Sequence, residues 1–286
     1  MVEFDPAVPL RDWLTMDLQV VLPNESPEMP ADRPAQIAVA AEELGYHTAW
    51  LPDHVLPPEE YGSFYGGVYE PLITLSGIAA RTSRIRLGTS VLVLPLRDPF
   101  SLAKQVATLD RLSGERLTLG LGVGWDKKEF ENVGSDFRTR GARTDEAIDL
   151  MRALFAGQRS FDGKYYGFDG GVFEPRPRGN VRLMVGGISD AALRRATRVA
   201  DEWQSVAADP AEFAAQVARL RTFADRPIRV GTRISWDGLE STTSLARALS
   251  DAGAEFLAVW FGEDNGYEDR MAAFLDAMRP ALRLSD

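Results

Sequence analysis

The residue best suited to proton chemistry is a histidine that follows a short apolar run. Thr48-Ala49-Trp50-Leu51 is predicted to be a buried strand, and Asp53 and His54 lie just beyond it. Because an imidazole changes charge near neutral pH, His54 is a candidate proton donor or acceptor. Asp53 is either its partner or a cap, and a histidine bonded in a loop for structural reasons is the alternative. The only other histidine, His47, precedes the strand and is expected at its opposite end.

A second candidate site lies where a strand meets a helix. Gly186-Gly187-Ile188-Ser189 follows the apolar run Val181–Val185 and opens a helix that ends at Val199. Glycines let a backbone approach a ligand closely, and the first amides of a helix attract phosphate. A tight turn with Ser189 as the helix cap explains the same residues equally well.

Two further strand ends carry small residues. Gly88-Thr89-Ser90 leads into Val91, and Gly122-Val123-Gly124-Trp125 ends the next strand. The second segment lacks the GxGxxG spacing and no helix follows it directly, so it does not indicate a Rossmann dinucleotide site. Its glycines serve either the close approach of a planar ring or the packing of strands. Glu129 follows, and we interpret it as a solvated surface carboxylate.

These residues need elements to position them, and eight short apolar segments alternate with helical ones. Such alternation predicts a parallel sheet, and eight units predict an α/β fold of the (β/α)8 TIM-barrel type. We expect one domain over 1–286, with 1–15 as an N-terminal extension. Residues 157–180 are too long for a plain connection, so we predict an inserted lid or hairpin near the carboxyl ends of the strands. The predicted strands are Met16–Leu22, Thr48–Leu51, Ile85–Val93, Leu117–Val123, Val181–Val185, Glu202–Val206, Ile228–Ile234 and Phe256–Phe261.

Composition excludes several classes of site. The net charge of −10 argues against nucleic-acid binding. The absence of cysteine removes disulfides, thiolate nucleophiles and iron–sulfur clusters, and two histidines cannot form a three-histidine zinc site, so no metal centre is predicted. No apolar run reaches the roughly 18 residues of a membrane-spanning helix, and the N-terminus lacks a signal pattern. The default expectation is a cytoplasmic protein without membrane partners.

Several motifs together resemble a known family. They are AEELGYHTAWLPDH, LGTSVLVLPLRDP, LAKQVATLDRLSGERLTLGLGVGW, KKEFENVG and VGGISDAALRRATRVADEW. From about Met16 to about Arg279 the chain is similar to the bacterial luciferase-like oxidoreductases, which include coenzyme F420-dependent dehydrogenases and reductases and FMN-dependent monooxygenases. The TSVLVLP and GVGW forms look closer to the F420 members.

The resemblance implies a cofactor site. In such relatives the pair matching Asp53 and His54 contacts the cofactor, with the histidine near the reacting ring. The peptide matching Ser90-Val91 is a non-prolyl cis bond that forms a bulge behind the ring, and Gly186 to Ser189 match the phosphate site. The resemblance also implies a homodimer and a small-molecule substrate. The cofactor-contacting residues expected on this basis are Asp53, Ser90, Val91, Val93, Val123, Gly124, Gly186, Gly187, Ile188 and Ser189.

Alternatives to an F420-dependent oxidoreductase stay open at this point. One is an FMN-dependent monooxygenase, and another is a cofactor-binding protein without turnover. A glycoside hydrolase would use a pair among Asp53, Asp126 and Glu263, but no spacing singles one out. Some sugar-phosphate dehydrogenases of the F420 group carry a glutamate where Trp125 stands, which argues against that substrate. A cationic patch for the acidic tail of F420 would comprise Arg176, Arg178, Arg182, Arg194 and Arg195, although solvated charges explain these residues equally well.

Overall fold

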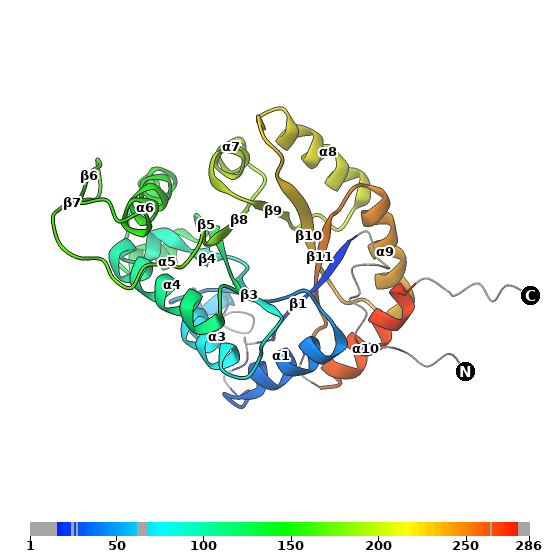
Figure 1. The fold of residues 1–286 in the computed structure, drawn as a ribbon. Coiled ribbons are helices and arrows are strands. Elements are labelled where there is room, and N and C mark those ends of the chain that lie inside the picture. The colour runs from blue at the N-terminus through cyan, green and yellow to red at the C-terminus, as the bar shows by residue number, and fades with distance from the viewer. Residues whose placement is uncertain (1–15, 24–25, 27, 62–67, 264, 280–286) are drawn as a thin grey trace, which may run out of the picture.

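The computed structural model describes residues 16–23, 26, 28–61, 68–263 and 265–279. The expected extension over residues 1–15 lies outside the described residues. Within them, parallel strands form a closed barrel and helices surround it (Figure 1). The predicted (β/α)8 barrel is therefore confirmed.

Each predicted strand is present within one or two residues of its expected bounds. The sheet closes because β3 pairs with β5 as well as with β2, with Leu87 opposite Leu117. β3 and β4 share the third position of the barrel, on either side of a break at Ser90 and Val91. The barrel strands are β1 (Asp17–Val21), β2 (Thr48–Leu51), β3 (Arg86–Thr89), β4 (Leu92–Val93), β5 (Leu117–Gly122), β8 (Arg182–Gly186), β9 (Glu202–Ser205), β10 (Arg229–Ser235) and β11 (Phe256–Trp260).

The helices form the outer layer, and local chemistry sets many of their ends. Asp98 caps α4, because its carboxylate accepts a hydrogen bond from the Ser101 amide at 2.7 Å. Asp32, which precedes α1, makes no such capping bond, and its carboxylate accepts a hydrogen bond from the Gln36 side chain at 2.7 Å instead. The helices are α1 (Arg33–Leu44), α3 (Pro71–Ala79), α4 (Pro99–Ser113), α5 (Lys127–Asn132), α6 (Arg140–Phe155), α7 (Asp190–Val199), α8 (Pro210–Arg221), α9 (Leu239–Asp251) and α10 (Tyr267–Met278).

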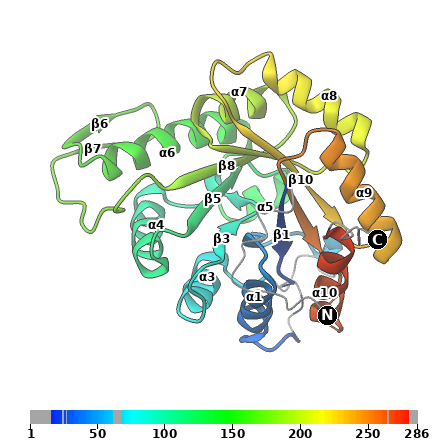
Figure 2. The same ribbon diagram turned by 45° about the vertical axis from the view of Figure 1, so that its right-hand side comes forward.

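The insertion contains a hairpin, as one of the two interpretations predicted. Its strands are β6 (Ser160–Asp162) and β7 (Gly167–Asp169), which pair antiparallel. Phe168 packs edge-on against Phe100 of α4, and the Tyr166 amide donates to Glu146 of α6 at 2.7 Å. The hairpin thus lies outside α6 on the helical layer (Figures 1 and 2). These contacts bear out the hairpin, and a role for the insertion as a lid stays a prediction.

Glycines inside the barrel make room for large side chains. A Cβ atom at Gly88 would lie 2.3 Å from the Trp50 ring, and one at Gly231 would lie 2.4 Å from the Phe256 ring. Trp50 and Phe256 are fully buried. Such contacts are too short for real atoms, so these positions accept glycine only, and the interior is a packed core rather than a channel.

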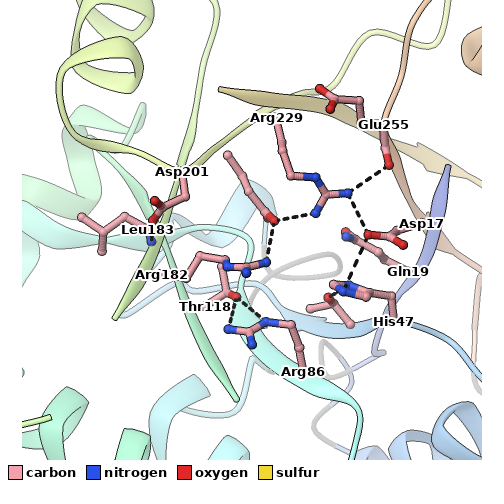
Figure 3. A network of polar contacts seen from close by, with 12 residues as sticks. Asp17, Gln19, His47, Arg86, Thr118, Arg182, Leu183, Asp201, Arg229 and Glu255 are labelled. Carbon is pink, nitrogen blue, oxygen red and sulfur yellow. Dashed lines mark hydrogen bonds and ion pairs between the residues drawn. The ribbon is translucent and has the colours of Figure 1, made fainter. Parts of the chain in front are cut away.

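The amino end of the barrel is closed by a network of charged side chains (Figure 3). Arg229 bonds to Asp17 at 2.7 Å and to Glu202 at 3.0 Å, and Arg182 bonds to Glu202 at 3.3 Å. His47 lies 3.6 Å from the same Asp17, which places it at the amino end as expected. Burial raises the pKa of Glu202 above its usual value, against the attraction of Arg229 and Arg182.

This raised pKa predicts how one substitution changes the pH dependence of stability. The folded protein holds the Glu202 proton at higher pH than the unfolded chain. Its protonation therefore adds stability that is complete below the unfolded pKa, near 4.5, and is lost as the pH rises through the folded value. Glu202→Gln removes this effect. The difference in Tm, wild type minus variant, should therefore increase as the pH falls toward about 4.5. Calorimetry of both proteins tests this, and a shift in the opposite direction would contradict it.

Candidate functional site

The residues predicted to carry chemistry follow the carboxyl ends of different strands. His54 follows β2, Trp125 and α5 follow β5, and the Gly187 turn follows β8. In a parallel barrel these ends lie on one face. The structure therefore gathers the predicted loops at a single end of the molecule, opposite the network of Figure 3.

His54 is held by a carboxylate from α5. Its Nδ1 atom lies 3.1 Å from Oε2 of Glu129, and only 9% of its side chain is exposed. The ring of Trp125 meets the imidazole edge-on, with the centroids 6.1 Å apart. The histidine is thus fixed from two sides by the segment that follows β5.

Glu129 corrects an expectation from the sequence. It was interpreted as a solvated surface residue, but it is 2% exposed. Its Oε1 atom accepts hydrogen bonds from the amides of Val55 at 2.7 Å and Leu56 at 3.0 Å. Burial alone would raise its pKa, but the bonds from His54 and from these two amides outweigh burial and lower the pKa below its usual value. No local signal could have revealed this role, because its partners lie more than 70 residues earlier.

Asp53 has different partners from those of its neighbour. Its carboxylate accepts the Val93 amide at 2.9 Å and the Arg97 guanidinium at 2.6 Å, and its side chain is fully buried. Arg97 also binds Glu70 at 2.8 Å. Burial would lower the pKa of Arg97, but Asp53 and Glu70 raise it. Asp53 therefore ties the loop after β2 to β4, and a catalytic role for it stays a prediction.

The break between β3 and β4 is a bulge with buried polar contacts. The Ser90-Val91 peptide bond is cis, as the resemblance implies. The Ser90 hydroxyl lies 2.6 Å from Oε1 of Gln204, and the Ser90 carbonyl accepts a bond from Arg233 at 3.2 Å. Nε2 of Gln204 is buried and has no hydrogen-bond partner within the described part of the chain. A donor of this kind beside the bulge suits a bound acceptor group.

The neighbouring glycines make room for Val91. A Cβ atom at Gly122 would lie 2.5 Å from Cγ2 of Val91, and one at Gly186 would lie 3.0 Å from Cγ1. Gly124 has a φ of +75°, and a Cβ there would lie 2.7 Å from the buried Phe130 ring. Val123 precedes it and is half-buried. Of the two readings of these glycines, the structure supports strand and side-chain packing directly.

The turn after β8 leaves backbone open to solvent. Gly187 has a φ of +110°, and its carbonyl accepts a bond from the Trp203 indole at 2.9 Å. Ser189 caps α7 by accepting the Ala192 amide at 3.3 Å, which confirms the predicted cap. Ile188 is 46% exposed. The turn can therefore admit an anionic group to the first amides of α7.

Several of the remaining arginine and carboxylate candidates make structural contacts. Arg195 is buried and binds Asp145 at 2.7 Å, and Arg194 stacks over the Phe223 ring, so the predicted cationic patch loses two members. Asp126 caps α5 by accepting the Glu129 amide at 2.8 Å. Since Asp53 is also engaged, two of the three carboxylates considered for glycoside hydrolysis are committed elsewhere.

Neither a metal centre nor a membrane-spanning helix is present among the described residues. In that part of the chain, no group of three or more histidine, aspartate or glutamate side chains is arranged to hold a metal ion. None of the helices described is long and apolar enough to cross a bilayer.

Residues 16–279 match the model of the luciferase-like monooxygenase family. The chain belongs to this family. It is an oxidoreductase, as predicted from the motifs.

Two relatives of the family illustrate what the chain resembles in sequence. An uncharacterised protein of Mycobacterium tuberculosis is 35% identical over 79% of this chain and 83% of its own length. An F420-dependent glucose-6-phosphate dehydrogenase of Nakamurella multipartita is 36% identical over 58% of this chain. The second similarity spans only 50% of that enzyme.

Solved structures of other proteins share the fold of this chain at low sequence identity. An F420-dependent secondary alcohol dehydrogenase in complex with an F420-acetone adduct superimposes with a TM-score of 0.78, at 16% identity, over 93% of this chain and all of that chain. The oxygenating component of a Pseudomonas putida diketocamphane monooxygenase in complex with FMN gives 0.76, at 14% identity, over 92% and 97%. Likeness at this level establishes the barrel alone.

The contact between Val91 and Gly122 predicts the cost of one added methyl group. Gly122→Ala would force its Cβ against Val91, and such overpacking costs about 1–3 kcal/mol. In a Val91→Ala background the same change should cost less, because the clashing methyls are gone. Urea unfolding of the two single variants and the double variant measures this coupling.

Gly77 provides the matched control for that experiment. It lies in α3, where an added Cβ would meet nothing within 4 Å. Gly77→Ala should therefore stabilise the protein by about 0.5–1 kcal/mol. Equal costs of Gly122→Ala in both backgrounds would show that Val91 does not determine the need for glycine.

Proposed function

We propose that this protein is a coenzyme F420-dependent oxidoreductase that transfers a hydride between F420 and a small organic substrate. The observation that carries the proposal is His54, held by Glu129 at the carboxyl face of the barrel. The same face holds the Ser90-Val91 bulge. The F420-dependent enzymes among its relatives support the choice of cofactor.

The residues present fit such a cofactor. Its ring would lie against Ser90, Val91 and Val93, with Val123 and Gly124 at the adjacent strand end. The buried Gln204 amide beside Ser90 supports this placement, because it offers a donor to an acceptor group on the ring. The phosphate would occupy the open turn formed by Gly186, Gly187, Ile188 and Ser189.

The chain contributes proton transfer and positioning to the reaction. A bound deazaflavin supplies hydride transfer. When a hydroxyl-bearing substrate is oxidised, its carbon loses a hydride and its oxygen loses a proton, and we assign the proton to His54. A positioned general acid or base of this kind contributes about 10²–10⁴-fold to a rate. Asp53 would act indirectly, because it anchors the bulge through the Val93 amide.

An FMN-dependent monooxygenase is the second candidate function. It is favoured by the FMN-bound relative, which has the same barrel. A cofactor-binding protein without turnover is less well supported, since it gives no reason for a histidine fixed by a buried carboxylate. We also propose that the protein forms a homodimer and acts in the cytoplasm, as predicted from the sequence.

Titration with each cofactor separates the two main candidates. The purified protein should quench or shift the fluorescence of F420 at lower concentration than that of FMN. Ile188→Glu would place a negative charge beside the proposed phosphate turn, and it should weaken binding at least tenfold, or about 1.4 kcal/mol. Valine at Gly187 is a poorer test, because the φ of +110° at Gly187 would strain the backbone.

A matched control makes the same chemical change elsewhere. Leu112 is 62% exposed in the last turn of α4, at the amino end of the barrel. Leu112→Glu should leave binding unchanged. Tighter binding of FMN than of F420 would replace the proposal with the monooxygenase, and equal effects of the two glutamates would move the phosphate site elsewhere.

A further inference from the structure

We propose that Glu129 is a positioning residue that holds the neutral His54 ring with its proton on Nδ1. The Nε2 atom of His54 is then the one that exchanges a proton with the substrate. The statement about substrate rests on the proposed function, whereas the statement about the ring proton does not. Glu129 does not itself touch the reacting atoms in this account.

The assignment follows from how the two carboxylate oxygens are shared. Oε2 faces Nδ1 of His54 at 3.1 Å, and Oε1 accepts the amides of Val55 and Leu56. An ionised carboxylate can only accept hydrogen bonds, so the ring nitrogen that faces it must be the donor. The lowered pKa of Glu129 keeps the carboxylate ionised at neutral pH.

The position of the carboxylate is set by α5 and its packing. The Asp126 side chain caps the helix at the Glu129 amide, 2.8 Å away. The next residue, Phe130, is fully buried and its ring occupies the space that a Cβ at Gly124 would need. Phe130 also packs edge-on against Phe137 at 5.2 Å. Glu129 is therefore held by the end of β5 and by a local aromatic cluster.

This arrangement makes Nε2 the ring atom that accepts and returns the substrate proton. With the proton on Nδ1, Nε2 carries the lone pair and can accept the proton of a substrate hydroxyl during oxidation. The imidazolium that forms is stabilised by the buried carboxylate behind it. In the reverse reaction the same Nε2 proton returns to the substrate oxygen as the hydride reaches carbon, so charge and atoms balance.

Glu129 also holds the loop beside the ring. Val55 and Leu56 are 48% and 52% exposed, although their amides are bound to the buried carboxylate. Their side chains therefore present an apolar surface at a fixed backbone position next to His54. One carboxylate therefore holds both the His54 ring and the exposed apolar loop beside it.

Imidazole ¹⁵N NMR of the cofactor-free protein tests the ring proton directly. The chain has only two histidines, so two sets of ring signals are expected, and His54→Gln identifies its own set by loss. The ¹⁵N shifts of the neutral wild-type ring should report the proton on Nδ1. In Glu129→Gln the amide oxygen can still accept the loop amides, while the NH₂ group donates to Nδ1, so the proton should move to Nε2.

A control on the same helix separates position from charge. Glu131 is exposed and pairs with Lys127 at 3.2 Å. Glu131→Gln removes the same charge, and it should leave the His54 tautomer unchanged. Circular dichroism of each variant confirms that the comparison is made between folded proteins.

The outcomes are distinct from those of the cofactor titration. A wild-type ring with its proton on Nε2 would overturn the proposal without any variant. A folded Glu129→Gln protein that keeps the proton on Nδ1 would also overturn it. If the tautomer inverts as expected but F420 does not bind, the role of Glu129 stands and the proposed function fails. Once a substrate is found, Glu129→Gln should lower kcat more than it raises KM.

Discussion

Closure of the parallel barrel is the constraint on which the rest of the structure depends. The pairing of β3 with β5 completes the ring of strands, and it leaves a bulge at Ser90 and Val91 where β3 passes into β4. The barrel strands all run the same way, so the loops after β2, β5 and β8 meet at one face. The barrel thereby brings together groups that are distant in the sequence: a histidine, a carboxylate and the open backbone amides of a turn.

The two ends of the barrel use charge for different purposes. At the amino end, Arg229, Asp17 and Glu202 satisfy one another and seal the core (Figure 3). At the carboxyl face, the Glu129 carboxylate is divided between a titratable ring and two loop amides. Burial raises the pKa of Glu202 but is outweighed at Glu129 by hydrogen bonds to its charged form. His47 lies 3.6 Å from Asp17 at the amino end, whereas His54 contacts Glu129 at the carboxyl face, where ligands bind in barrels of this type.

Local patterns predicted the fold well because the forces that set it are local. Apolar runs gave the barrel strands, and Asp98 and Ser189 act as caps because a cap needs only the next three residues. Contacts between distant segments were not predictable. Asp53 was expected to be a partner of His54 or a cap, but it binds Arg97. Glu129 was interpreted as a surface residue, although it is the partner of His54. The packing role of the glycines at 122, 124 and 186, one of the alternatives left open, became visible only in the folded structure, which shows Val91 and Phe130 beside them.

The cofactor is expected to bind at one end of the barrel and to affect only the histidine at that end. The two histidines lie at opposite ends, with His47 in the amino-end network and His54 at the carboxyl face. Ring signals of both can be followed by NMR while F420 is added. We predict that the His54 signals shift with saturating behaviour while those of His47 stay in place. Movement of His47 alone, or of neither ring at saturating F420, would contradict a cofactor site at the carboxyl face.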